Sequence, residues 1–331
     1  MPQRLNILIW HIHGSYLNAL GRIPHNWYLP VKAGRPEGYG GRGRTFDWPE
    51  WMREVPAERV RDLDLDLVIY QTPKNLFEDG PEILSEAQRE LPRIYLEHNT
   101  PRPSAVDTRH PMDDPGTLLV HVTHYNRLMW DSGRTPAMVI EHSVAIDPAA
   151  VYTGERERGI TVANGMQKRP RIAGYDIFER VRQVVPLDAA GMDTERMGGL
   201  GDVPYRELHR RVGQYRFLFS PMRYTSLPLA VIEAMTIGMP VVALATTELP
   251  TVIEDGETGY VSCDVDELID RMKGLLADPQ EARRLGRNAR AVARERFGME
   301  RFARDWNTAF ALVTGGMRTR AGRKMASMGA D

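Results

Sequence analysis

Residues 219–263 read FSPMRYTSLPLAVIEAMTIGMPVVALATTELPTVIEDGETGYVSC and combine a turn, a short apolar helix, a buried strand and a second turn. Pro228 suits the first helical position, because its missing N–H would have no helical partner there. Leu229–Ile237 is apolar almost all round, which predicts a buried helix, and Gly238 suits the left-handed residue that ends it. Residues 240–245 (PVVALA) then predict a strand covered on both faces.

Glu233 is the only charged residue of this apolar helix. A carboxylate there costs free energy unless it has a partner. One interpretation is a structural salt bridge, or an exposed edge of the helix. The other is a carboxylate held for a polyhydroxylated ligand, beside a helix N-terminus whose free amides attract phosphate. We favour the ligand.

The rest of the chain alternates strand and helix patterns, which predicts an α/β fold with helices on both faces of mostly parallel sheets. The expected strands lie near residues 5–10, 66–71, 93–97, 118–123, 138–140, 159–163 and 216–220. The expected helices lie near Leu17 and over 82–90, 126–131, 174–184, 204–211, 264–277, 279–297 and 300–313. Residues 34–49 are rich in glycine and arginine, so we expect a mobile loop.

Composition narrows the class of protein. The chain has 331 residues, enough for two domains with separate cores, and 42% hydrophobic and 26% charged residues, as in soluble globular proteins. A net charge of −1 gives no reason to expect a nucleic-acid partner. The single cysteine, Cys263, excludes an internal disulfide and favours a reducing, cytoplasmic location. No apolar run approaches 18 residues, and the N-terminus leads directly into a strand, so we expect neither membrane insertion nor a signal peptide.

The 219–263 stretch resembles the C-terminal signature of group 1 (family 4-type) glycosyltransferases, a retaining family with the GT-B fold. Their motif has the form S-x-x-E-G-x-G/P-L-x-x-L-E-A-M-A-x-G-x-P-V-V, followed by E-x-x-x-D-G-x-x-G-x-L. The matching residues are Ser220, Pro228, Leu229, Ile232, Glu233, Ala234, Met235, Gly238, Pro240, Val241, Val242, Glu248, Leu249, Pro250, Ile253, Asp255, Gly256, Thr258, Gly259 and Tyr260. The resemblance is close over about the last third of the chain and loose elsewhere.

The resemblance implies two Rossmann-like doubly wound domains that face a central cleft. Residues 1–148 would form the N-terminal, acceptor-side domain, and residues 149–297 the nucleotide-sugar donor domain. Residues 298–313 would form a helix that crosses back to the N-terminal domain. Residues 314–331 are polar and basic, and we expect a disordered tail.

The implied activity is a metal-independent, retaining transfer of a hexosyl or N-acetylhexosaminyl group. The donor would be a nucleotide-diphosphate sugar, UDP- or GDP-linked, with no further cofactor. The acceptor would be a hydroxyl of a carbohydrate, a lipid-linked molecule or a small molecule. Family members carry two glutamates separated by seven residues, and the first of these falls at Thr225. The alternative is therefore a catalytically impaired protein that still binds sugar nucleotides.

The family's residue roles carry over to part of the motif. Glu233 would hold the ribose hydroxyls of the donor. The backbone at Leu227, Pro228 and Leu229 would lie against the diphosphate. Thr225 and Ser226 would lie near the transferred sugar, without the carboxylate that relatives have there.

Relatives also use an arginine and a lysine, in the form G-R-x-x-x-x-K-G, to neutralise the leaving diphosphate. Aligned on Gly174, the lysine position is Ala173, so the pattern is broken. Lys168, Arg169 and Arg171 are close enough to substitute, and an arginine fork suits phosphate geometry. A solvated basic turn is the alternative.

The N-terminal half contributes two more strand ends. Open α/β sheets bind ligands beyond the carboxyl ends of their strands, so the turn His13-Gly14-Ser15 should line the site. Gly14 would let the backbone approach the donor closely, and Ser15 would lie beside it. His98 occupies a position that faces the donor sugar in relatives; an ordinary hydrogen bond in a turn is the alternative. The 34–49 loop is the candidate for acceptor contacts.

Two patterns could suggest a metal, and we expect none. His11 and His13 have no further ligand at suitable spacing. Asp62, Asp64 and Asp66 form two overlapping D-x-D triplets, but they precede a strand, and the chemistry belongs at the opposite strand end.

Overall fold

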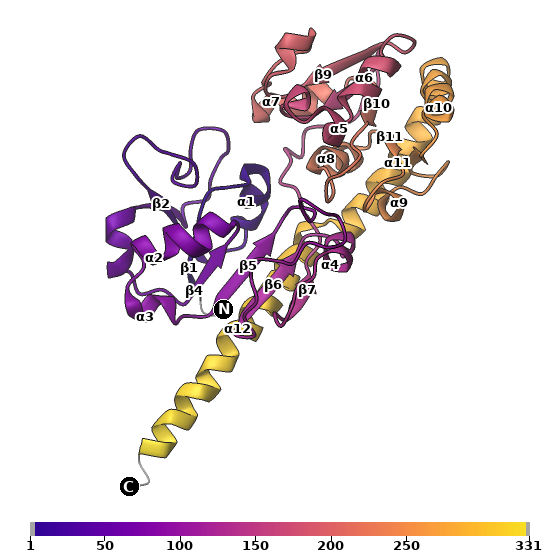
Figure 1. The fold of residues 1–331 in the computed structure, drawn as a ribbon. Helices are drawn as coiled ribbons and strands as arrows, with labels where there is room; N and C mark the ends of the chain where they lie inside the picture. The colour runs from indigo at the N-terminus through magenta and orange to yellow at the C-terminus, as the bar shows by residue number, and fades with distance from the viewer. Residues whose placement is uncertain (1–3, 329–331) are drawn as a thin grey trace. The chain divides into compact units, whose positions relative to one another are not determined.

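The computed structural model describes residues 4–328, and the chain divides into two compact units. One unit comprises residues 1–142 and 299–331, and the other residues 143–298. The division falls after His142, six residues before the expected boundary at 148. Each unit contains a parallel sheet of its own (Figure 1).

The first unit is built on seven parallel strands in the order β3-β2-β1-β4-β5-β6-β7. Their bounds are β1 (Asn6–Ile9), β2 (Asn26–Val31), β3 (Met52–Pro56), β4 (Leu67–Tyr70), β5 (Arg93–Glu97), β6 (Thr117–His121) and β7 (Ala137–Val139). β1 and β4 to β6 are almost wholly buried, as their continuous apolar runs predict. β2 and β3 were not expected. β3 lies at the edge of the sheet, where its charged residues and proline are tolerated. β2 lies between β3 and β1, and its Asn26 and Pro30 interrupt the apolar pattern.

The helices of the first unit are α1 (Gly14–Leu20), α2 (Gly80–Ile83), α3 (Glu86–Arg89), α4 (His124–Met129) and α12 (Met299–Met328). The single helix expected over 82–90 is wrong. Ser85 interrupts it and starts α3 with a capping box, in which its hydroxyl accepts from the Gln88 N–H and the Gln88 side chain accepts from the Ser85 N–H. At α4 the cap is the hydroxyl of Thr123, which accepts from the Asn126 N–H at 3.0 Å, and His124 is the first helical residue.

Helix α12 groups with the N-terminal segment because its first turns pack and hydrogen-bond there. The indole N–H of Trp306 donates to the Tyr16 hydroxyl at 3.2 Å, and both side chains are buried. The Arg301 guanidinium donates to the backbone oxygens of Glu141 (2.9 Å) and His142 (2.6 Å).

The tail beyond residue 313 differs from the expectation. In the structure the backbone of α12 continues to Met328, where the sequence predicts a disordered tail. Residues 329–331, the end of the predicted tail, lie outside the described part of the chain.

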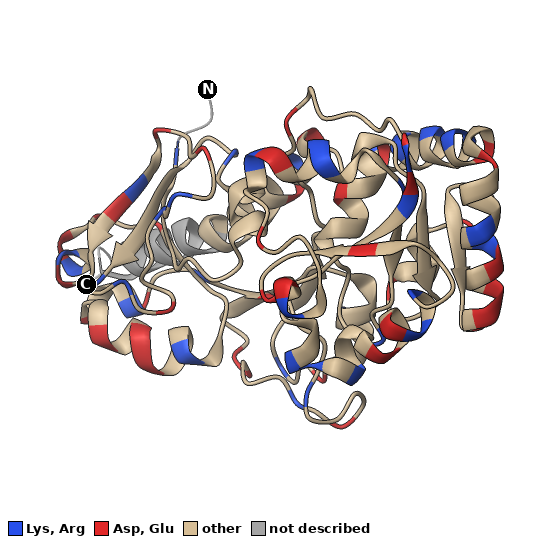
Figure 2. Cartoon of the chain, turned by 90° about the horizontal axis from the view of Figure 1, so that it is seen from above, with Lys and Arg blue, Asp and Glu red and all other residues tan. Residues whose placement is uncertain are grey.

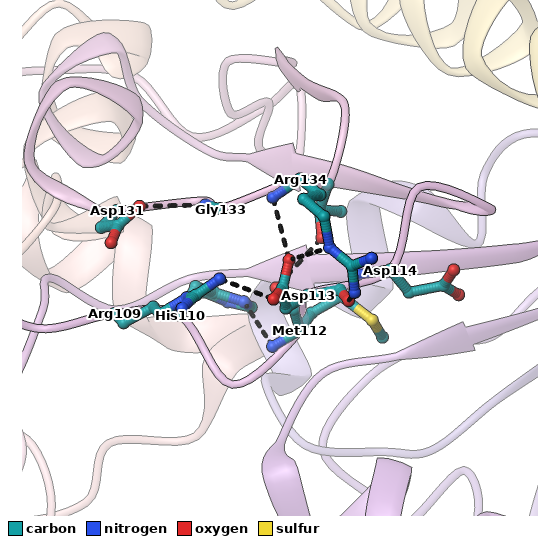
Figure 3. Close-up of polar contacts among 9 residues, drawn as sticks. Arg109, His110, Met112, Asp113, Asp114, Asp131, Gly133 and Arg134 are labelled. Atoms are coloured by element: carbon teal, nitrogen blue, oxygen red, sulfur yellow. Dashed lines mark hydrogen bonds and ion pairs between the residues drawn. The ribbon is translucent and has the colours of Figure 1, made fainter.

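The connection between β5 and β6, residues 98–116, is held at both ends. At its start, a buried pair joins Glu97 Oε2 to His110 Nε2 at 3.1 Å. Near its end, Asp113 accepts from the Arg109 guanidinium (2.6 Å) and from the backbone and side chain of Arg134 (2.9 and 3.2 Å), as Figure 3 shows. These bonds fix the loop that leaves the carboxyl end of β5.

The second unit contains a five-stranded parallel sheet in the order β12-β11-β10-β8-β9. The strands are β8 (Arg156–Val162), β9 (Leu187–Ala190), β10 (Tyr215–Ser220), β11 (Val241–Leu244) and β12 (Gly259–Ser262). The helices are α5 (Pro170–Ala173), α6 (Tyr175–Val181), α7 (Tyr205–Val212), α8 (Leu229–Ile237), α9 (Leu249–Val252), α10 (Val265–Ala277) and α11 (Pro279–Arg296). Two apolar clusters, one on α8 and one on α6 and α10, cover the sheet.

The predicted elements of the key stretch are confirmed. Residues on nearly all sides of helix α8 are buried, and Gly238 ends the helix at φ 92°. Every residue of β11 is buried. Pro228 differs slightly, since it lies one residue before the first helical residue.

Both sheets have a point where the strand order reverses. In the first unit the chain builds outward on one side from β1 and on the other from β4. In the second unit the reversal lies between β8 and β10. Ligands of open α/β sheets bind beyond the carboxyl ends of the strands at such points. We therefore expect each unit to bind its ligand at its own reversal point.

Gly174 brings together the loops that leave β8 and β10. It joins α5 to α6 at φ 70°, and a Cβ there would lie 1.8 Å from the Pro221 carbonyl oxygen. Any side chain would therefore push apart the segments that follow the two strands at the reversal point.

Replacing Gly174 by alanine should lower the free energy of unfolding by about 3 kcal/mol, combining left-handed backbone strain with overpacking. Gly198→Ala is the matched control, because Gly198 has φ 76° but open space around its Cβ position. It should cost only about 1 kcal/mol. Urea unfolding measures both, and equal losses would contradict the packing argument.

Candidate active site

The loops at the reversal point of the second unit contain most of the predicted donor residues. Residues 163–174 follow β8, and residues 221–228 follow β10. The Arg223 N–H donates to the Ile172 oxygen at 2.9 Å, which ties the two loops together in addition to the packing of Gly174.

Glu233 is nine-tenths buried on α8 and has two neighbours on α7. The Tyr205 hydroxyl lies 3.3 Å from its Oε1, and His209 Nε2 lies 3.5 Å from its Oε2. Both contacts leave lone pairs on the carboxylate, which can accept about four hydrogen bonds in all. Glu233 is thus held by partners on its own unit and still has capacity for ligand hydroxyls.

Tyr205 and His209 were missed from the sequence. They lie four residues apart, the spacing that places two side chains on one face of a helix. Their rings meet edge to face with centroids 4.8 Å apart. That spacing was visible in the sequence, but its relation to Glu233 depends on the packing of α7 against α8.

Two small pockets lie along α8, one at Glu233 and one at the N-terminus of the helix. One is lined by His209 and Glu233 among others, and the second by Ser220 and Pro228. Val162 and Ala230 line both. The carboxylate and the start of the helix therefore border on neighbouring space at the carboxyl ends of β8 and β10.

The N-terminus of α8 is suited to an anion. Pro228 occupies the cap position and makes no side-chain cap hydrogen bond, and the first turn contains no acidic residue. The first amides of a helix have no partner within it, and its dipole favours negative charge there. The predicted segment Leu227, Pro228 and Leu229 lies at this place.

The three predicted basic residues differ in what they contact. Lys168 pairs with Asp193 at 2.6 Å, and Arg171 pairs with Asp176 at 2.9 Å. Arg169 is exposed, and within the described residues its guanidinium has no hydrogen-bond or ion-pair partner. Arg169 is therefore the best placed of the three to contact a phosphate. Elsewhere in the chain, acidic residues lie among basic ones along many helices (Figure 2).

Arg223, which the sequence did not single out, holds the loop after β10. Its guanidinium makes a two-pronged contact with Asp176 of α6, at 2.6 and 2.7 Å. This contact, with help from the charge of Arg171, lowers the pKa of Asp176 to about 2.

Thr225 and Ser226 lie in the same loop, next to an unusual turn. Thr225 is half-buried and Ser226 is buried. The Ser226 carbonyl accepts from the hydroxyl of Thr247, which follows β11 and has φ 52°. A β-branched residue in the left-handed region is an outlier of the kind that clusters at functional sites.

In the first unit, His98 lies beside residues that follow the neighbouring strands at the reversal point. Its Nε2 lies 3.0 Å from Gln71 Oε1, and its ring centroid lies 4.0 Å from that of His13 and 4.7 Å from that of Tyr16. Burial lowers the pKa of His13 to about 4 and lowers the pKa of His98 well below its usual value, with His13 and His142 adding to the effect. Both imidazoles are therefore neutral near pH 7.

Gly14 and Ser15 begin α1, beside the 34–49 loop. A Cβ on Gly14 would lie 2.8 Å from a ring carbon of Phe46, so the segment that lies close against the Gly14 backbone is this loop. Residues 34–49 form no regular helix or strand, yet they are tied down. Arg35 makes a two-pronged contact with Glu54 at 3.0 Å, and the Gly41 carbonyl contacts the His11 ring.

Residues 195–292 match the family model described as glycosyl transferases group 1. Over this segment, the chain is similar to the group 1 glycosyl transferases. It contains α7, α8 and the strands β10 to β12, and therefore Glu233 with both of its partners.

Curated relatives match about a quarter of the chain length. The MMP alpha-(1->4)-mannosyltransferase of Mycolicibacterium hassiacum is 41% identical over 86 residues, 25% of this chain and 21% of the relative. The N-acetyl-alpha-D-glucosaminyl L-malate synthase of Bacillus anthracis is 32% identical over 88 residues, 26% of this chain and 23% of the relative. The alignments thus span less than a quarter of each relative's length.

Solved structures share the whole fold. The sucrose-phosphate synthase of Thermosynechococcus elongatus has a TM-score of 0.67 at 14% identity, covering 95% of this chain and 100% of its own. HepE of Anabaena, solved with UDP, also has a TM-score of 0.67 at 14% identity, covering 93% and 100%. With its two Rossmann-like parallel-sheet units, the chain has the GT-B fold. No helix among the described residues is long and apolar enough to cross a membrane.

The Asp176–Arg223 contact gives a pH-dependent prediction. A carboxylate whose folded pKa is lowered stabilises the fold above its unfolded pKa of about 4, and this stabilisation is lost as the pH falls towards 2. Because Asp176 is nearly half exposed, we expect Asp176→Asn to cost no more than about 1 kcal/mol at pH 7. The difference between the two proteins in urea unfolding should shrink between pH 4 and pH 2. A difference that stays constant over this range would contradict the assignment.

Proposed function

We propose that this protein is a metal-independent, retaining glycosyltransferase that moves a hexosyl or N-acetylhexosaminyl group from a nucleotide-diphosphate sugar to an acceptor hydroxyl. The observation that carries the proposal is the buried Glu233, held by α7 next to the uncapped N-terminus of α8. A carboxylate and a row of free amides suit the two parts of a nucleoside diphosphate, the ribose diol and the anionic phosphates.

Glu233 has the chemistry to bind the ribose. An ionised carboxylate accepts hydrogen bonds from two neighbouring hydroxyls with its two oxygens. The Tyr205 hydroxyl bonds the Glu233 side chain and the His209 ring lies beside it, so the side chain is restricted before the ligand arrives and less side-chain entropy is lost on binding.

The diphosphate would lie at the start of α8. The amides around Leu229 and the positive end of the helix dipole stabilise the charge that develops on the leaving group. Arg169 can add a cation from the loop after β8, because it has no acidic partner among the described residues. Lys168 and Arg171 would first have to leave Asp193 and Asp176.

Thr225 and Ser226 are proposed as sugar-binding residues of the second unit, His98 as a sugar-binding residue of the first, and the 34–49 loop as the acceptor-binding segment. The donor is proposed to be UDP- or GDP-linked. HepE was solved with UDP, and two relatives are named for mannosyl and N-acetylglucosaminyl chemistry, which supports a hexose-type donor. We propose that the reaction takes place in the cytoplasm, where the exposed Cys263 would stay reduced.

A second candidate function is sugar-nucleotide binding with impaired turnover. The observation that favours it is Thr225, which supplies a hydroxyl where the family motif has a carboxylate. Purified protein that binds a sugar nucleotide but neither hydrolyses nor transfers it would support this candidate. Slow donor hydrolysis would exclude it.

A thermal-shift panel of UDP-, GDP-, ADP- and TDP-sugars tests the donor class. A ligand that binds only the folded state raises the melting temperature, by an amount that grows with its concentration relative to Kd. We expect one base to stand out among the four. No shift with any of them would contradict the proposal.

Glu233→Ala should weaken the binding of that nucleotide by about 10- to 100-fold, the loss of one or two hydrogen bonds to a charged group. The fold should survive, since the Tyr205 hydroxyl also lies 3.3 Å from the Ala145 oxygen. Glu295→Ala, which removes an exposed carboxylate from α11 of the same unit, is the matched control. Calorimetry measures both affinities, and an unchanged affinity in the Glu233 variant would refute the ribose assignment.

A further inference from the structure

Three residues at the reversal point of the first unit form one hydrogen-bonded row. Trp10, Gln71 and His98 each follow directly after a strand, namely β1, β4 and β5. These strands are neighbours in the sheet, so their carboxyl ends lie side by side. Gln71 lies in the middle of the row and is 2% exposed.

The direction of each hydrogen bond follows from the chemistry of the groups. The Trp10 carbonyl is only an acceptor, and it lies 2.6 Å from the Gln71 amide nitrogen, which must donate to it. Turning the amide over would set two oxygens against each other at that distance. The Gln71 oxygen is therefore fixed on the side of His98, where it can only accept.

A fixed acceptor at 3.0 Å from Nε2 requires a hydrogen on Nε2. We propose that Gln71 is a positioning residue that holds His98 as the neutral tautomer with Nε2 protonated and Nδ1 carrying the lone pair. Any group that hydrogen-bonds His98 at Nδ1 must then bring its own hydrogen. A hydroxyl meets this requirement, and a carbonyl or carboxylate oxygen does not.

The surroundings of His98 favour a neutral ring. Its titratable neighbours are His13, His142 and Tyr16, and Arg301 lies beside His142 and Tyr16. Burial, helped by His13 and Arg301, lowers the pKa of His142 to about 3, so no neighbouring imidazole is charged near pH 7. Burial is the main cause of the lowered His98 pKa, and the two contributing titratable neighbours, His13 and His142, lower it further.

The inference rests on the proposed function only for its effect on catalysis. If His98 faces the donor sugar, its Nδ1 accepts a hydrogen bond from a sugar hydroxyl, and Gln71 sets the direction of that bond without touching the sugar. The tautomer itself can be measured with no substrate present.

The test compares Gln71→Met with the wild-type protein by ¹H–¹⁵N correlation spectroscopy of the histidine rings, with His98 assigned through a His98→Gln variant. The wild-type ring should show a single neutral form near pH 7, with a directly observed Nε2–H that exchanges slowly with water. Gln71→Met removes both bonds at nearly the same size, so this Nε2–H signal should be lost or displaced.

Gln88→Met is the matched control. Gln88 is another buried amide of the first unit, and it donates to the carbonyls of Val60 and Leu63. Its loss should lower stability to a similar extent and leave the His98 signals unchanged. An Nδ1–H or a charged ring in the wild type, or an unchanged Nε2–H signal in Gln71→Met, would overturn the inference.

The kinetic arm separates this inference from the proposed function. Gln71→Met should lower kcat for donor hydrolysis or transfer by about tenfold, the equivalent of one hydrogen bond, while nucleotide Kd stays the same. An unchanged kcat would show that the tautomer has no role in turnover. Failure of the wild type to bind any sugar nucleotide would refute the proposed function, and the spectroscopic result would still decide the role of Gln71.

Discussion

The candidate donor site depends on the contact between the backbone of Gly174 and the carbonyl of Pro221. Because no side chain intervenes, the loops that leave β8 and β10 lie against each other at the point where the strand order reverses. Arg223 reinforces the contact through Asp176. The loop after β10, fixed in this way, leads directly into the start of α8, and α8 in turn positions Glu233. This arrangement would therefore already be formed before a nucleoside diphosphate binds.

The two units use the same sheet geometry with different chemistry. The second unit offers charge, in a carboxylate, uncapped amides and an exposed guanidinium. The first offers neutral groups whose hydrogen-bonding direction is fixed, in His98 and Gln71 beside the aromatic ring of Tyr16. Charge suits the binding of phosphates, and neutral directional groups suit the hydroxyls of a sugar.

Much of the fold was predictable, because buried parallel strands and the apolar α8 are strong local signals. Strands β2 and β3 were missed since their polar residues and prolines hide the pattern, and Ser85 divides a helix that its neighbours made look continuous. Glu233 stood out as a charge in an apolar helix. Tyr205, Arg223 and Gln71 did not, because each acts on a residue distant in the sequence, and only the strand order and helix packing bring them together.

The most direct test of the central claim is a crystal structure of the protein with the sugar nucleotide that it binds, in which the distances from the ribose oxygens to the Glu233 carboxylate are measured. The account predicts both ribose hydroxyls within about 2.7–3.0 Å of the carboxylate, with the diphosphate at the start of α8. A nucleotide bound elsewhere, with Glu233 in contact only with Tyr205 and His209, would contradict it.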